Sequence, residues 1–141
     1  MTLPLSALLP LLLLLGAAAE SPRPMVVIDE EKVKREEAPP HGAIGMSTAY
    51  RISDAAPGRA MEFRKRVLHV GAAIGPHPID HDEVYYVLSG EGEVVSNGTT
   101  ASLRPGMAAY LYSGAIVGIR QIGRKKLSLI ISYPLAARKA D

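Results

Sequence analysis

Residues 71–90 read GAAIGPHPIDHDEVYYVLSG, a stretch that joins a turn-rich half to a run of β-favouring residues. Side chains two apart on a strand share a face, so Glu83, Tyr85 and Val87 are predicted to point the same way. His77 precedes this strand by a short connection. We therefore expect an imidazole and a carboxyl group close to one face of a predicted strand.

A second stretch, residues 106–121, reads GMAAYLYSGAIVGIRQ and contains another predicted strand. Its alternate residues Val117, Ile119 and Gln121 share a face by the same spacing. Two such strands, together with His77, can line the interior of a small β-barrel. An interior of this kind predicts a small-molecule pocket.

Short β-favouring runs alternate with turn residues over most of the chain, a pattern typical of a β-sandwich or barrel. The pair Asn97-Gly98 between two such runs is the strongest hairpin signal, because both residues tolerate a positive φ. The predicted strands span residues 47–52, 60–70, 72–77, 83–89, 92–96, 99–103, 107–112, 115–121 and 126–133.

The spacing within residues 71–90 resembles the first motif of the cupin superfamily. That motif is a glycine, five residues, His-x-His, three or four residues, a glutamate, six residues and a glycine. Every interval fits, and Ile79 takes the place of the second histidine. The matching positions are Gly71, His77, Glu83 and Gly90.

Residues 106–121 resemble the second cupin motif, again with every interval kept. Tyr112 replaces its proline, Val117 its histidine and Gln121 its asparagine. The resemblance covers residues 43–134. It implies an all-β fold, namely a double-stranded β-helix or jelly-roll barrel with a short N-terminal extension.

In cupins, three histidines and the glutamate hold a divalent metal such as manganese, iron, nickel or zinc. The resemblance keeps only His77 and Glu83 of these four ligands, since Ile79 and Val117 cannot coordinate a metal. An open metal site usually has three protein ligands. The expected cofactor is therefore none, or a weakly bound divalent metal.

His81 is a candidate third ligand, because it lies in the short connection between His77 and Glu83. A shift of that connection could aim its imidazole inward. The alternative is a loop histidine that is hydrogen-bonded to Asp80, to Asp82 or to water. The sequence leaves both open.

Two functions are compatible with these residues. The first is an exported cupin that binds a small polar metabolite or sugar-like ligand, in which His77 and Glu83 form a polar pair. The second is a metal-dependent isomerase, lyase or dioxygenase, with His77 and Glu83 as acid and base and His81 as a relocated ligand. The residues expected to contact the ligand are Ile79, Tyr85, Tyr112, Val117, Ile119 and Gln121.

Residues 8–15 form a leucine-rich run, which small residues follow as far as Ala19. This pattern predicts a secretory signal peptide cleaved after Ala19, although residues 1–7 carry no Lys or Arg. We expect a periplasmic or extracellular protein without further membrane attachment. The expected divisions are a signal peptide (1–19), an N-terminal extension or linker (20–42), the barrel domain (43–134) and a C-terminal tail (135–141).

Within the extension, residues 26–28 are apolar and are predicted to add a strand to a sheet edge. Residues 29–37 are highly charged, with pairs such as Glu30 and Lys34 at helical spacing. They indicate either one or two helical turns or a solvated linker. The short exposed strands and the resemblance both favour a homodimer.

The chain has 141 residues, a net charge of +2 and no cysteine, so we expect one domain without disulfides or thiolate ligands. Two basic runs, residues 64–66 and 124–126, are interpreted as a solvated strand face or turn. With one Phe and no Trp, the chain is poorly supplied for stacking on bases. The expected partners are a small-molecule ligand and a second copy of the chain, and no nucleic acid.

Overall fold

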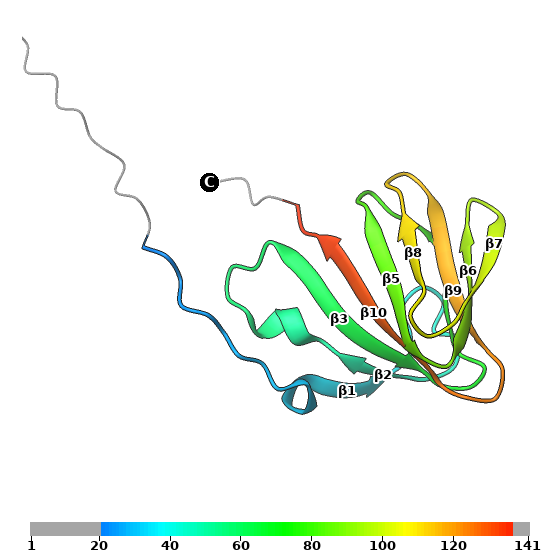
Figure 1. The fold of residues 1–141 in the computed structure, drawn as a ribbon, viewed down its shortest axis with the longest axis horizontal. Helices are drawn as coiled ribbons and strands as arrows, with labels where there is room; N and C mark the ends of the chain where they lie inside the picture. Colours follow the sequence, from blue (N-terminus) through cyan, green and yellow to red (C-terminus); the bar gives the residue numbers. More distant parts are fainter. Residues whose placement is uncertain (1–20, 137–141) are drawn as a thin grey trace, which may run out of the picture.

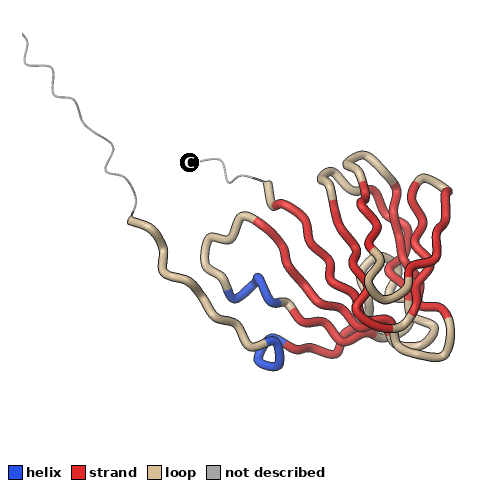
Figure 2. Tube along the Cα trace, viewed as in Figure 1, coloured by secondary structure: helices blue, strands red, loops and turns tan. Residues whose placement is uncertain are grey.

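The structure is a computed structural model that describes residues 21–136. The signal peptide expected at residues 1–19 lies outside this range, as does most of the C-terminal tail. The described residues form ten strands and two 3-10 helices (Figures 1 and 2). These are η1 (Glu30–Val33), β1 (Lys34–Glu37), β2 (Ser47–Tyr50), η2 (Ile52–Ala55), β3 (Met61–Leu68), β4 (Ala73–Pro78), β5 (Glu83–Ser89), β6 (Glu91–Ser96), β7 (Thr99–Leu103), β8 (Ala108–Leu111), β9 (Ile116–Ile122) and β10 (Leu127–Pro134).

The strands form two antiparallel sheets that face each other. One sheet has the order β1-β2-β3-β10-β5-β8 and the other has the order β4-β9-β6-β7. Figure 1 shows β5 to β9 gathered into a barrel, with β3 and β10 running out to one side toward β1 and β2. The predicted jelly-roll barrel is confirmed. None of the helices within residues 21–136 has the length and apolar character needed to cross a bilayer.

The nine predicted strands correspond to the nine strands from β2 to β10. The Asn97-Gly98 hairpin is confirmed as well, because Ser96 pairs with Thr99 across it and both turn residues have positive φ. A mirror-image turn of this kind matches the right-handed twist of the flanking strands. Local turn chemistry therefore sets the register of β6 and β7.

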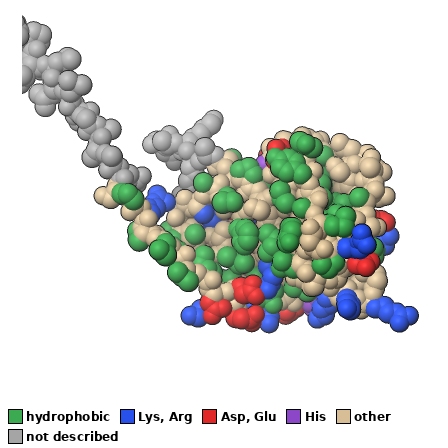
Figure 3. Space-filling view, viewed as in Figure 1, with side chains coloured by type: hydrophobic (Ala, Val, Ile, Leu, Met, Phe, Trp, Pro, Cys, Tyr) green, Lys and Arg blue, Asp and Glu red, His purple; other side chains and the backbone are tan. Residues whose placement is uncertain are grey.

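The N-terminal segment agrees with the expectations only in one helical turn. Residues 26–28 form no strand, and residues 29–37 form one 3-10 turn followed by β1. The edge of the sheet is taken by β1 instead, whose Lys34 pairs with Tyr50 of β2. Charged residues of this segment pair both locally and across the fold: Lys34 lies 3.4 Å from Glu31, and Glu30 contacts Lys65 of β3. Figure 3 shows the resulting band of charged side chains along the edge formed by η1 and β1.

The apolar core fills the space between the two sheets. The alternate residues Leu127, Leu129 and Ile131 of β10 point into it, and the first two are fully buried. Leu68 does the same at the end of β3. The other members of the cluster are Ala72, Ile74, Ile79, Tyr85, Val87, Val94, Leu103, Leu111, Ala115, Val117 and Ile119.

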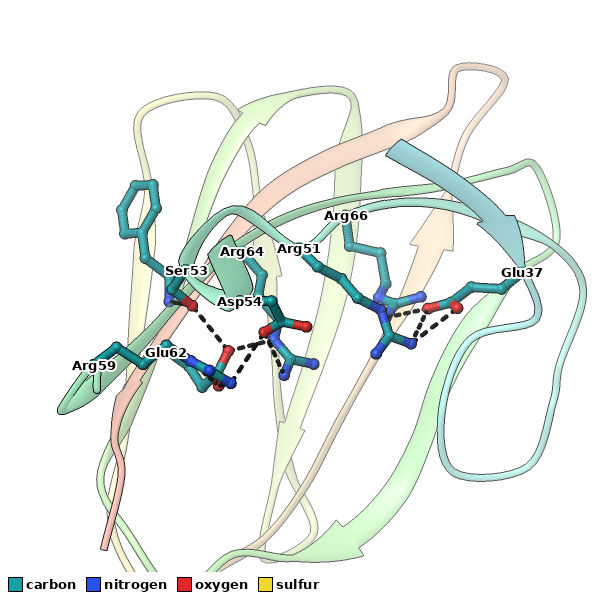
Figure 4. Close-up of polar contacts among 9 residues, drawn as sticks. Glu37, Arg51, Ser53, Asp54, Arg59, Glu62, Arg64 and Arg66 are labelled. Carbon is teal, nitrogen blue, oxygen red and sulfur yellow. Dashed lines mark hydrogen bonds and ion pairs between the residues drawn. The ribbon is translucent and has the colours of Figure 1, made fainter. Parts of the chain in front are cut away.

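The inner face of β3 changes character along its length. Leu68 is apolar, but the preceding residues on the same face are Arg66, Arg64 and Glu62. Glu62 is only 1% exposed. It accepts hydrogen bonds from Arg59 at 2.7 and 3.0 Å, from Arg64 at 2.7 Å and from Ser53 at 3.0 Å (Figure 4).

These hydrogen bonds keep Glu62 ionised although its side chain is buried away from solvent. Burial by itself raises the pKa of a carboxyl group, but hydrogen bonds from Arg64 and Arg59 outweigh it, so the pKa of Glu62 lies below its ordinary value. The apolar core stops where this charged row begins. The space next to the row is therefore lined by polar groups.

We expect Glu62→Gln to destabilise the fold by about 3 kcal/mol, because two part-buried guanidinium groups lose the buried carboxylate that faces them. Urea unfolding measures this change. Glu93→Gln is the matched control, because Glu93 forms an exposed ion pair with Arg120 and its loss is expected to change stability by less than about 1 kcal/mol. Equal effects of the two substitutions would contradict the structural role given to Glu62.

Candidate functional site

One pocket opens at the end of the barrel where the charged row of β3 begins. Its volume is about 260 Å³. It combines apolar walls with titratable groups from several elements, which is typical of small-molecule sites. Its lining residues are Pro40, His41, Arg64, Arg66, Ile74, His77, Pro78, Ile79, Asp80, His81, Glu83, Tyr85, Ile131 and Tyr133.

Glu83 is the buried carboxyl group of this pocket. It is the first residue of β5, points inward like Tyr85, and is 5% exposed. Burial raises the pKa of Glu83, and the nearby His81 and His77 offset only part of this increase. The carboxyl group therefore holds a proton to a higher pH than an exposed glutamate does.

His81 lies beside Glu83, with Nε2 3.6 Å from a carboxyl oxygen of Glu83. Its other nitrogen, Nδ1, is 3.0 Å from Asp80, and its ring stacks on Tyr133 at 4.3 Å. The Nε2 atom is buried and has no hydrogen-bond partner among the described residues. The contact with Asp80 matches the expectation of a loop histidine hydrogen-bonded to Asp80. The position of the ring in the pocket lining matches the alternative, an imidazole aimed inward.

His77 is oriented by the backbone of its own strand. Its Nδ1 lies 2.8 Å from the carbonyl oxygen of Gly75, and because a carbonyl only accepts, Nδ1 carries the proton. The ring of His77 stacks on that of His41 at 3.6 Å, with 6° between the ring planes. Burial, followed by the charge of His77, lowers the pKa of His41.

A close backbone contact with Gly75 holds His41 at the pocket. Its carbonyl oxygen accepts a hydrogen bond from the Gly75 amide at 2.9 Å. A Cβ atom at position 75 would lie only 2.1 Å from that oxygen, so glycine is required there. His41 has a φ of 60°, a value that is strained for a residue with a side chain. The connection between β1 and β2 is therefore bound to the barrel rim at this point.

The residues predicted from the sequence divide into four groups. His77, Ile79, His81, Glu83 and Tyr85 line the pocket.

Val117 and Ile119 point inward but belong to the apolar core, outside the pocket lining. Tyr112 is 70% exposed and lies against Tyr110 on the outside. Gln121 lies at the opposite end of β9, where its side chain accepts a hydrogen bond from Gly71 and donates to the carbonyl oxygens of Ile122, Gly123 and Lys125.

Sequence reasoning missed His41, Arg64, Arg66 and Tyr133. Residues 64–66 were interpreted as a solvated face, which is wrong for Arg64 and Arg66, whose side chains are 25% and 6% exposed. Strand alternation counted back from the apolar Leu68 is the signal that finds both arginines. No comparable signal points to His41, whose position depends on the contact with Gly75.

The donor atoms of the pocket do not fit a firmly held transition metal. Two of the four ligand positions implied by the resemblance are Ile79 and Val117, both buried. Because Nδ1 of His77 is bonded to a carbonyl group, this residue could offer only its Nε2 as a ligand. Within residues 21–136 no three His, Cys, Asp or Glu side chains are grouped closely enough to hold a metal ion.

Comparison with known proteins identifies relatives of this chain. The family model described as "Cupin domain" matches residues 64–133. A predicted oxalate decarboxylase from Thermotoga maritima superposes with a TM-score of 0.69 and 23% identity over 79% of this chain and 100% of its own. A search of curated proteins found no match.

Two further solved structures have the same fold. The polyketide cyclase RemF from Streptomyces resistomycificus has a TM-score of 0.67 and 18% identity over 78% of this chain and 79% of its own. An RmlC-like cupin from Shewanella frigidimarina has a TM-score of 0.62 and 18% identity over 81% of this chain and 95% of its own. At these identities the likeness concerns the fold alone.

Glu83→Gln is expected to stabilise the protein near neutral pH. Because the folded-state pKa of Glu83 lies above the ordinary value of 4.5, the folded state binds more protons than the unfolded state between these two values. The free energy of unfolding therefore falls as the pH rises through this window. The Glu83→Gln side chain does not titrate, so the variant does not undergo this fall. Thermal melts of both proteins from pH 4.5 upward measure the difference in stability. We expect equal Tm values at the low end of this range and a Tm that is a few degrees higher for the variant at higher pH. A mutant that is less stable at every pH would contradict the raised pKa.

Protein purified without added metal is expected to contain well below one divalent metal per chain, since two protein ligands seldom hold such an ion firmly. Elemental analysis measures this, and dialysis against EDTA is expected to leave Tm unchanged. The opposite outcome is nearly one metal per chain, lost in both His77→Ala and His81→Ala but kept in His69→Ala. That result would establish a relocated site.

Proposed function

Because this chain belongs to the cupin superfamily, we propose that it binds a small polar metabolite or sugar-like ligand in the pocket at the end of its barrel. The observation that carries the proposal is the pair formed by the buried Glu83 carboxyl group and the unpartnered Nε2 of His81. A buried polar atom without a partner is costly to maintain. A ligand hydroxyl group supplies that partner.

The chemistry of the walls supports a ligand with mixed character. Protonated Glu83 can donate a hydrogen bond, and ionised Glu83 can accept one. Ile74, Ile79 and Ile131 supply apolar surface, which suits the C–H groups of a sugar-like ring. A volume of about 260 Å³ suits a small molecule.

A second candidate function is acid–base catalysis in the same pocket, as in an isomerase or a lyase. The raised pKa of Glu83 favours it, because a catalytic acid or base works best with a pKa near the operating pH. His77 and His81 are the other proton-transfer groups. The metal-dependent form of this function has less support, because the donor atoms do not fit a metal.

Export and dimerisation complete the proposal. Export rests on the leucine-rich segment before Ala19. Dimerisation rests on the outer strands of the sheets, since β8 and β7 each have a strand neighbour on one side only. Pairing along such an edge is a common route to association.

Ligand binding is tested by recording amide chemical shifts while neutral monosaccharides, uronic acids and small hydroxy acids are added. We expect shifts confined to the pocket lining. Binding is expected to be at least about tenfold weaker in His81→Ala, which corresponds to the loss of roughly one hydrogen bond. His69→Ala is the control, because His69 contacts Thr48 and lies outside the pocket lining. Shifts that cluster elsewhere, or equal effects of the two substitutions, would rule out this pocket as the binding site.

A further inference from the structure

We propose that the ligand of this pocket is a carboxylic acid, and that Arg64 and Arg66 of β3 receive its carboxylate group. This inference rests on the proposed binding function and names the ligand class. It starts from the charged row on the inner face of β3, which lies next to the pocket. Figure 4 shows that row as two clusters of ion pairs.

The two clusters contain more cations than anions. Among the residues labelled in Figure 4, four guanidinium groups face three carboxylates. Asp54 and Glu62 balance Arg59 and Arg64, whereas Glu37 alone faces Arg51 and Arg66. Arg59 and Arg64 thus form a neutral cluster, and the second cluster has one positive charge in excess.

Arg66 is the buried member of the unbalanced cluster. Glu37 makes a two-point contact with Arg51 at 2.9 and 3.0 Å, so Arg66 shares one of its oxygens at 3.2 Å. The remaining contact of Arg66 is with the neutral Ser47 hydroxyl group at 2.8 Å. Its side chain is only 6% exposed, and a buried cation of this kind gains from a further anion.

Glu83 does not fill that role. No hydrogen bond or ion pair joins it to Arg64 or Arg66 among the described residues. Its nearest charge partners are His81 and His77, and burial favours its neutral form. The anion that completes the cluster therefore comes from outside residues 21–136, and in this inference it is the carboxylate of a ligand in the pocket that both arginines line.

Arg64 is held in a fixed pose that suits carboxylate recognition. Its Nε donates to Glu62 at 2.7 Å, and its Nη2 lies 3.7 Å from Asp54. Its Nη1 makes no hydrogen bond within residues 21–136. A guanidinium group anchored on one side presents its remaining N–H groups without further loss of conformational entropy.

The positions of the other pocket groups restrict the rest of the ligand. With the carboxylate at β3, the body of the molecule lies along Ile74 and Ile131. Its far end reaches His81 and Glu83, at the start of β5, which is separated from β3 by β10 in the same sheet. A small hydroxylated acid, such as a uronic acid or a short hydroxy acid, has a polar group at each end to meet these two regions.

Matched pairs of compounds test the inference in the unmodified protein. D-glucuronate is compared with D-glucose, and lactate with propane-1,2-diol, by titration calorimetry at low and high salt. We expect each acid to bind at least about tenfold more tightly than its neutral partner, with a preference that weakens in salt. Neutral compounds that bind as tightly as the acids overturn the inference, as does the absence of binding by every acid.

Arg64→Lys and Arg66→Lys test the two receptor residues, because lysine keeps the charge but loses the planar fork. Each is expected to weaken acid binding about tenfold and to leave neutral compounds unaffected. Arg120→Lys, at an exposed ion pair, is the control. Equal weakening of acid and neutral binding would overturn the assignment to these arginines. If neutral sugars bind in a His81-dependent way without any preference for acids, the binding function stands and the carboxylate inference fails.

Discussion

The burial of Glu62 between Arg59 and Arg64 is the constraint on which the rest of this structure depends. A carboxylate so far removed from water is tolerated only with cations fixed around it, and β3 supplies one of them two residues further on. That requirement places charge on the inner face of a strand whose other end is apolar. The core consequently ends within the barrel, and the unfilled volume beyond it becomes the pocket.

Most of the fold was predictable from local signals. Strand alternation and turn residues located nine strands, and Asn97-Gly98 located a hairpin. The strand β1 of the N-terminal segment was not predictable in this way, because its conformation depends on partners far away in the sequence. Glu37 joins Arg51 and Arg66 in ion pairs that draw residues 34–37 into the sheet. Helical spacing of charges carries no information about such contacts.

The site was predictable in part, and the limits have identifiable causes. Alternation placed Glu83 and Tyr85 correctly, because a strand fixes which face each residue occupies. It could not tell how far along the barrel a residue lies, so Val117 and Ile119 were assigned to the ligand although they pack in the core. Tyr112 follows the end of β8, where the alternation no longer applies.

The two ends of β9 carry different tasks. At one end, Val117 pairs with His77 beside the pocket. At the other, the Gln121 amide organises the turn that leads into β10 through bonds with four backbone groups. Along β9, the residue beside the pocket and the residue that organises the turn are therefore different ones. A substitution beside the pocket on this strand leaves the hydrogen bonds of Gln121 intact, so the ligand-facing end of β9 can change during evolution while the turn into β10 is kept.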